Sequence, residues 1–289
     1  MMIFIDEMKV FIFVSICIYL CQGFCPDDID LQTHQCQCDL ITSSIRCSNL
    51  PNRCRTCHRY KQMFITNEIE ILQEKALHFF DFHVLTIEFS RLKTFSTRTF
   101  ANLLIQQNHH LQIRILEYLS PIIPTRLFEN LILQSKAKLT FEIFNTTQSI
   151  LTIQSHAFDG IKFNSQNRFQ FSVHSANELI RFEQNAGSIS VPSNVSIELT
   201  FSNAKRILFD EHSFSHITQN PSSQLILRLH NFSSIQFASN IFTDFHQFNH
   251  SNFHFSLANF RNLSIQSKFF NQISQCKSLF ELIRLVFLC

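Results

Sequence analysis

Hydrophobic residues recur along this chain with a period of about 28 residues. Phe214 anchors one unit, and steps of 28 residues, with a single step of 30 between 128 and 158, give the anchors Phe100, Phe128, Phe158, Ala186, Phe214, Phe242 and Phe270. Fifteen positions before the anchors stand Leu85, Ile113, Phe171, Leu199, Leu227 and Phe255. Five positions before them stand Phe95, Ile123, Ile153, Phe209, Phe237 and Ile265, with Arg181 as an exception. A fixed period of this size predicts a solenoid, in which stacked units share one continuous core.

Each unit opens with an alternation that predicts a strand. In LILRL at 225–229, Leu225, Leu227 and Leu229 point to the same side. The same frame occurs at 111–115, 169–173, 197–201 and 253–257, and a second extended step and a short arc with the anchor follow. Residues 62–82 do not follow the period, and the helix formers in EILQEKALHFF at 70–80 predict a short helix there.

The outward positions of these strands form a candidate binding face of mixed polar residues. They are Gln112, Arg114, Gln170, His174, Glu198, Thr200, Arg228, His230, His254 and Ser256.

This repeat resembles the leucine-rich repeat family, specifically secreted animal members with a disulfide-bonded N-terminal cap. The family pattern LxLxxNxLxxLxxxxFxxL covers residues 85–273 here, with Phe often in place of Leu. Asn203, Asn231 and Asn259 lie eleven positions before an anchor, one residue earlier than the ladder asparagine of the family. The resemblance implies an α/β to mainly β solenoid with a parallel sheet and a phenylalanine-rich core. It also implies that the Asn231 side chain turns inward and bonds backbone groups of adjacent coils.

The N-terminal 23 residues are typical of a secretory signal peptide. A lysine precedes the apolar run 10–20, and small or polar residues follow it, so cleavage is expected after Gly23. Asp6 and Glu7 fit this pattern poorly, and Met8 is an alternative start. A membrane anchor is the other interpretation, but the apolar run is short for a span.

Residues 24–61 are predicted to form a cysteine-rich cap. After a signal peptide, Cys25, Cys36, Cys38 and Cys47 are expected in disulfides, and the first repeat of a solenoid needs a cover for its apolar edge. The resemblance implies the pairs Cys25–Cys38 and Cys36–Cys47.

The cap ends in a CxxCH motif of Cys54, Cys57 and His58. CxxCH can attach haem covalently, and the same three side chains could bind zinc. We favour a further disulfide, within the pair or to a neighbouring cysteine, because the surrounding segment is already disulfide-like. The nearby basic residues could contact acidic glycans, but scattered charge is usual on exposed loops.

The solenoid is expected over 62–273, with about seven repeats from residue 83 and a tail at 274–289. Cys276 and Cys289 are too few for the C-terminal cap of the family. The tail is therefore either truncated or an improvised cap closed by Cys276–Cys289.

Composition and motifs favour an extracellular binding protein. The net charge of +2 predicts no nucleic-acid partner, and 34 Phe residues suit a stacked core. The chain contains no HExxH or GxSxG sequence and no phosphate-binding glycine loop, so we expect no enzyme, cofactor or metal. We predict a secreted, leucine-rich-repeat-like protein that binds a protein or a glycan through the sheet face and has no membrane span.

Three alternatives remain open: a parallel β-helical carbohydrate-active enzyme, a receptor ectodomain whose anchor is missing, and a structural matrix component. Two sheets and an arc per coil would favour the leucine-rich repeat, and three sheets per coil would favour the β-helix.

The sequons are expected to differ in glycan occupancy. Asn145, Asn194 and Asn249 fall in loops or irregular segments and are predicted to carry glycans. Asn231 is predicted to stay free because of its inward position, and Asn262 is left undecided.

Overall fold

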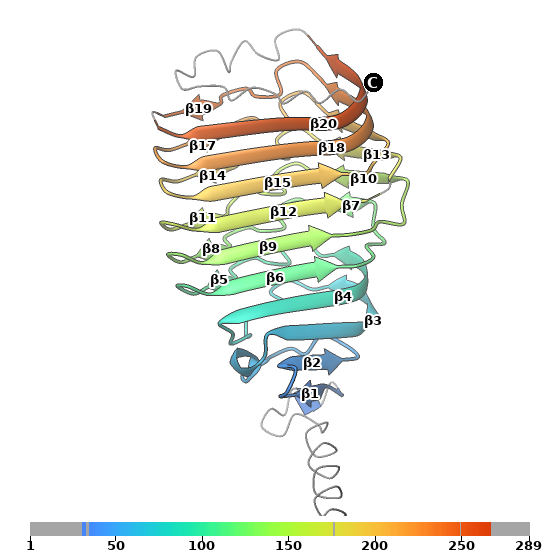
Figure 1. The fold of residues 1–289 in the computed structure, drawn as a ribbon, viewed down its shortest axis with the longest axis vertical. Helices are drawn as coiled ribbons and strands as arrows, with labels where there is room; N and C mark the ends of the chain where they lie inside the picture. The colour runs from blue at the N-terminus through green and yellow to red at the C-terminus, as the bar shows by residue number, and fades with distance from the viewer. Residues whose placement is uncertain (1–30, 33–34, 176, 249, 267–289) are drawn as a thin grey trace, which may run out of the picture.

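The computed structural model describes residues 31–32, 35–175, 177–248 and 250–266 of the chain. They form a parallel β-solenoid of about seven coils, with the long axis running from the N-terminal cap to the last coil (Figure 1). Within the described residues, the only helical element is the 3-10 segment η1, Cys57–Arg59. The expectation of a mainly β solenoid is confirmed.

The front sheet contains the first strand of each coil, and its strands lie one above the other (Figure 1). Alternating burial along these strands directs every second side chain into the core. In order along the axis they are β3 (Gln62–Leu72), β4 (Val84–Phe95), β6 (His110–Ile115), β9 (Lys138–Ile143), β12 (Arg168–His174), β15 (Ser196–Ser202), β18 (Gln224–Phe237) and β20 (Asn252–Ile265).

Two further rows of parallel strands complete each coil. The second row is β7 (Ile122–Ile123), β10 (Ile150–Ile153), β13 (Leu179–Phe182) and β16 (Arg206–Phe209), and the long strand β18 continues from the front sheet into it. The third row consists of two-residue strands: β5 (Leu104–Ile105), β8 (Ile132–Leu133), β11 (Lys162–Phe163), β14 (Ser190–Val191), β17 (Thr218–Gln219) and β19 (His246–Gln247).

The cross-section therefore has three rows of parallel strands per coil. This is the arrangement that we set as favouring a β-helix, although the third row pairs only two residues per strand. Two sheets and an arc, the arrangement expected of a leucine-rich repeat, are not what the described residues show.

The register of the front sheet refines the repeat. The step between paired residues is 26 from Val84 to His110, 28 from His110 to Lys138 and 30 from Lys138 to Arg168. The assignment of Leu85 to the column of Ile113 is wrong, because Ile87 pairs with Ile113.

Arg181 is not an exception within the core. Phe182, one residue later, pairs with Ile153 and Phe209 and fills that column. Arg181 points outward, where its guanidinium Nη2 lies 2.8 Å from Oδ2 of Asp210. The second strand of this coil is shifted by one residue relative to the period of the chain.

The predicted helix in 62–82 is wrong. Residues 62–72 form strand β3, which pairs in parallel with β4 on one side and with β2 (Ser44–Cys47) on the other. Lys75 then takes a left-handed backbone conformation with a φ of 61°, which ends any continuing helix. Pairing on both edges of the strand outweighs the helix propensity of this sequence, which is a weak preference.

The core is a stack of phenylalanine rings, as the anchors predict. The rings of Phe100 and Phe128 stack with centroids 5.6 Å apart, and Phe158 continues the stack at 6.1 Å from Phe128. The second row of strands adds Phe182 and Phe209, whose stacked centroids are 4.7 Å apart, and Phe237 at 4.9 Å from Phe209. Each coil thus buries its apolar face only against its neighbours.

Left-handed residues mark the corners of the coils. Two positions after an anchor, a positive φ occurs at Asn102, Asn130, Gly160, His216 and Asp244. Gly160 alone among these is glycine, and the others bring side chains to a conformation that strains most residues. The chain therefore turns repeatedly with few glycines.

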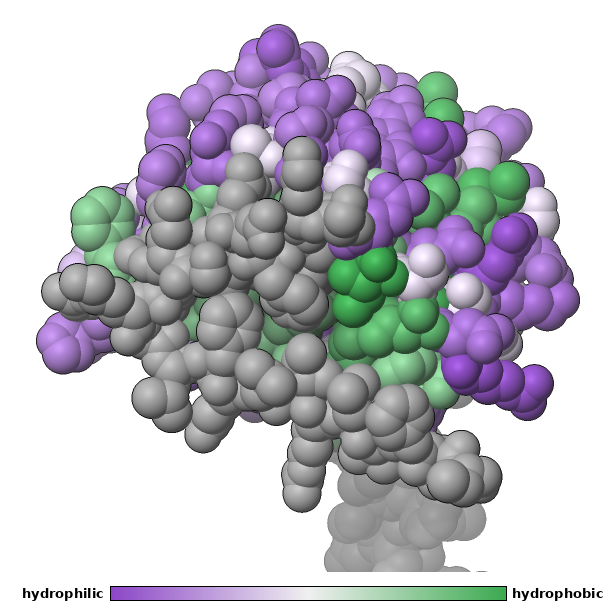
Figure 2. Space-filling model, turned by 90° about the horizontal axis from the view of Figure 1, so that it is seen from above, coloured by the Kyte–Doolittle hydropathy of each residue, from purple (hydrophilic) through white to green (hydrophobic). Residues whose placement is uncertain are grey.

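The two ends of the solenoid differ. At the N-terminal end, β1 (Gln37–Asp39) pairs antiparallel with β2 and covers the first coil. At the C-terminal end, the inward side chains of Phe253 and Leu263 are half-buried, and Figure 2 shows apolar surface there with polar residues around it.

Candidate binding face

The outward side chains of the front sheet form columns that run along the solenoid axis. Strand register places all ten predicted face residues in three columns. The first contains Thr86, Gln112, Thr140, Gln170, Glu198, Ile226 and His254; the second contains Glu88, Arg114, Glu142, Ser172, Thr200, Arg228 and Ser256; the third contains His174, Ser202, His230 and Ala258.

Arg114 occupies the centre of the N-terminal half of the face. Its Nη1 lies 2.7 Å from Oε2 of Glu88, and its Nε lies 3.7 Å from Oε2 of Glu142. Gln112 donates a hydrogen bond of 2.8 Å to the same Glu142 oxygen. The Arg114 guanidinium also lies over the ring of Phe144, 4.8 Å from its centroid, as in a cation–π contact.

Glu198 occupies the corresponding place in the C-terminal half. Its carboxylate lies between two arginines, 3.5 Å from Arg168 Nη2 and 3.1 Å from Arg228 Nε. The Glu198 side chain is 13% exposed, whereas that of Arg228 is 48% exposed. The cationic side chains therefore project farther from the sheet than the carboxylate between them.

Two histidines stand beside this group in the third column. His174 Nδ1 is 2.8 Å from Ser202 Oγ, and the rings of His174 and His230 are 6.5 Å apart. Burial lowers the pKa of both imidazoles, and the nearby charges of His174 and Arg228 lower the pKa of His230 further. Both rings are therefore predominantly neutral at neutral pH.

The expectation that Thr200 is an exposed face residue is wrong. Thr200 is 7% exposed, and its neighbours Ser172 and Ser202 are more deeply buried. Longer side chains of the surrounding columns cover these small residues. Ser172 Oγ is buried and has no hydrogen-bond partner in the structure.

Four residues of this face were missed in the sequence: Glu88, Phe144, Glu142 and Arg168. Glu88 and Glu142 lie in coils where the step is 26 or 30 residues, so a strict period of 28 does not find their columns. The alternation KLTFEI at 138–143 was the signal that could have shown the missing strand.

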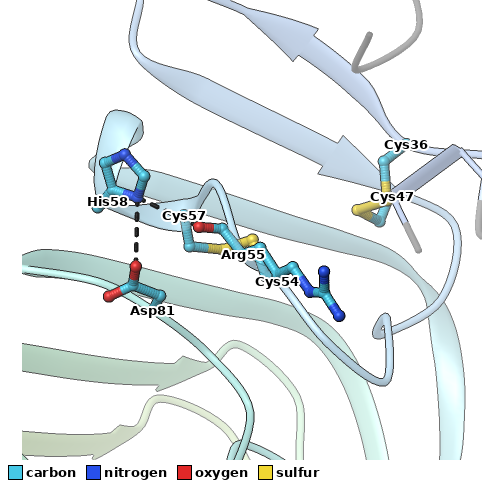
Figure 3. The surroundings of a disulfide bond; sticks show 7 residues. All are labelled: Cys36, Cys47, Cys54, Arg55, Cys57, His58 and Asp81. Carbon is cyan, nitrogen blue, oxygen red and sulfur yellow. Dashed lines mark hydrogen bonds and ion pairs between the residues drawn. A yellow bond between two sulfur atoms is a disulfide. The ribbon is translucent and has the colours of Figure 1, made fainter. Parts of the chain in front are cut away.

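The CxxCH motif forms a disulfide within the pair. Cys54 and Cys57 are bonded to each other, and both residues are fully buried. Figure 3 shows His58 turned toward Asp81, with 3.5 Å between His58 Nδ1 and Asp81 Oδ2. Because haem attachment needs two free thiols, this arrangement favours the disulfide interpretation. In the described part of the chain, no group of three or more metal-binding side chains gathers.

The predicted pair Cys36–Cys47 is confirmed (Figure 3). Cys38 is also in a disulfide. Cys25, Cys276 and Cys289 lie outside the described residues, as do the signal peptide and the tail. The pairs Cys25–Cys38 and Cys276–Cys289 therefore stay predictions.

The asparagine ladder exists, but on the outside of the solenoid. Asn203, Asn231 and Asn259 are exposed and left-handed, with φ values of 70°, 62° and 54°. Asn231 Nδ2 donates to Asn203 Oδ1, and Asn259 Nδ2 donates to Asn231 Oδ1, each over 2.9 Å. The inward orientation predicted for Asn231 is wrong, because these amides bond one another rather than buried backbone groups.

The other sequons keep their predicted accessibility where the structure describes them. Asn145 and Asn194 are exposed, and Asn262 is exposed on β20. Asn249 lies outside the described residues.

No family model, no curated protein and no solved structure matches this chain. Among the described residues, no helix has the length and apolar character needed to cross a membrane.

Proposed function

We propose that this chain is a secreted interaction protein that binds an extracellular protein or glycan through the front-sheet face. The observation that carries the proposal is the exposed arginine of a rigid sheet, shown by Arg228 beside Glu198 and by Arg114 over Phe144. Arginine and aromatic side chains are enriched where proteins bind macromolecules. A parallel sheet held on both sides by neighbouring coils offers such residues at fixed positions.

The disulfides Cys36–Cys47 and Cys54–Cys57 support the extracellular part of the proposal. Disulfides of this kind persist in oxidising compartments. The signal-like N-terminus points the same way. Membership of the leucine-rich repeat family is part of the proposal, and the three rows of strands and the outward asparagines depart from it.

A β-helical carbohydrate-active enzyme is the second candidate, and the three rows of strands per coil favour it. Such an enzyme needs carboxylates or bases free to act on a substrate. On this face, Glu88, Glu142 and Glu198 each lie within ion-pair distance of an arginine. We therefore place binding before catalysis.

Binding of the secreted protein to arrays of glycans and of extracellular proteins tests the proposal. Any ligand found should lose affinity with Arg228→Glu, which reverses a charge at the centre of the face. Arg206→Glu, an equally exposed change on the second row of strands, is the matched control. A ligand that binds both variants as it binds the unmodified protein would show that another surface is used. Release of reducing sugar ends from a polysaccharide would instead support the enzyme.

A further inference from the structure

A pair of histidines lies at the edge of the front sheet, apart from the binding face. His83 and His109 each precede a front strand, and their coils are adjacent. Nδ1 of His83 is 2.9 Å from Nε2 of His109, and the rings are 4.6 Å apart at 81° to each other. His83 is exposed and His109 is half-buried, so solvent reaches the pair.

The backbone holds the two residues at this spacing. The His110 N–H donates to the His83 carbonyl over 2.8 Å, and the Lys138 N–H donates to the His109 carbonyl over 2.9 Å. The buried ring of Phe82 lies 6.0 Å from that of His109, centroid to centroid. Both imidazoles are therefore placed by the solenoid itself, and binding a ligand would order little additional chain.

We propose that His83 and His109 chelate one divalent transition-metal ion, with Cu²⁺ and Ni²⁺ preferred to Zn²⁺. Two imidazole nitrogens about 2.0–2.1 Å from a metal are about 2.9 Å apart when the angle at the metal is about 90°, and about 3.3–3.4 Å apart at the tetrahedral angle. The observed 2.9 Å matches neighbouring positions in a square-planar or tetragonal site, which Cu²⁺ and Ni²⁺ adopt.

The change needed for chelation is small. In the hydrogen-bonded pair one ring donates its N–H to the other, so one proton occupies the space between the nitrogens. A metal ion displaces that proton, and each ring rotates about its Cβ–Cγ bond until both lone pairs meet at the ion. Water completes the coordination, and the carboxylate of Asp81, which interacts electrostatically with His109, offsets part of the positive charge.

Titration of the full secreted protein with Cu²⁺, Ni²⁺ or Zn²⁺ alone tests the proposal. His83→Ala and His109→Ala should each weaken the tightest Cu²⁺ and Ni²⁺ site about tenfold or more, since even indirect partners of metal-bound histidines change affinity by about 10–100-fold. His246→Ala removes an exposed histidine of the third row of strands and should leave that site unchanged. Equal affinity in all three variants, or a preference for Zn²⁺, would overturn the proposal.

A measurement on the unmodified protein covers the case in which a variant does not fold. Diethyl pyrocarbonate modifies accessible histidines, and peptide mass spectrometry locates the modified sites. One equivalent of Ni²⁺ should protect both His83 and His109 while His246 stays reactive. Protection of other histidines, with these two still reactive, would contradict the assignment.

Discussion

The ring of Phe214 lies so close to Gly187 that a Cβ added to the glycine would be 2.4 Å from ring atoms Cδ1 and Cε1. The preceding residue, Ala186, takes the anchor position that phenylalanine fills in the neighbouring coils. Phe214 also contacts Phe182, with ring centroids 5.5 Å apart. The missing ring at 186 and the missing side chain at 187 together make room for the anchor of the next coil.

Gly187→Ala should therefore destabilise the protein by about 1–3 kcal/mol or more, the usual effect of overpacking a core. Phe214→Ala should destabilise it by about 3–5 kcal/mol through loss of a buried ring. In the Phe214→Ala background the Gly187→Ala change should be nearly neutral, because the clash is gone. Chemical denaturation of the three variants gives the coupling energy. Additive effects of the two changes would show that the ring does not lie against residue 187.

Tyr118 should make the protein sensitive to alkali. Burial raises the pKa of Tyr118 to about 12, and its hydroxyl donates to the Ile122 carbonyl over 2.5 Å. The unfolded chain loses the phenolic proton near pH 10 and the native chain near 12, so the free energy of unfolding should fall by about 2–3 kcal/mol as pH rises through this interval. Tyr118→Phe should flatten this fall in denaturation curves taken across the interval. An unchanged fall in Tyr118→Phe would assign the alkaline sensitivity to other groups.

His174 and His230 should make the protein less stable in mild acid. Their pKa values are lowered by burial in the native state, so the unfolded chain binds protons first as pH falls through its own value of about 6.5. Stability contributed by the neutral rings is complete above this pH and is lost below it. Replacing both residues by glutamine should weaken the dependence of the unfolding free energy on pH between 5 and 8, and urea denaturation measures it. A dependence as steep as that of the unmodified protein would contradict the prediction.

Peptide mapping without reduction should recover three disulfides in the cap. The structure contains Cys36–Cys47 and Cys54–Cys57, and the resemblance implies Cys25–Cys38 for the third pair. A peptide that joins Cys54 or Cys57 to Cys25 would overturn this connectivity. Haem absorbance in the purified protein would also overturn it, because haem attachment consumes the Cys54 and Cys57 thiols.

Glycan occupancy should separate Asn194 and Asn145 from Asn231. The first two are exposed, whereas the Asn231 amide lies between those of Asn203 and Asn259. A sugar on Nδ2 of Asn231 would have to fit between coils about 4.8 Å apart. Site-resolved glycopeptide mass spectrometry should find Asn194 and Asn145 occupied and Asn231 largely free. High occupancy at Asn231 would show that the ladder does not exclude a glycan.

The sequence alone determined the solenoid, its phenylalanine stack and the Cys36–Cys47 pair. A buried position in one coil must meet a buried position in the next, so the period of the core is written along the chain. Phe100, Phe128 and Phe158 follow that period, and their rings stack as the spacing predicts.

Only the tertiary structure decided the local departures from this period, because they depend on contacts between coils rather than on local preference. Strand β3 formed where helix propensity predicted a helix, since β2 and β4 pair with both of its edges. The left-handed corner at Asn231 turned its amide outward, where hydrogen bonds to neighbouring amides satisfy it. The contact of His83 with His109 likewise depends on a coil of 26 residues, a length that the average period of the chain does not reveal.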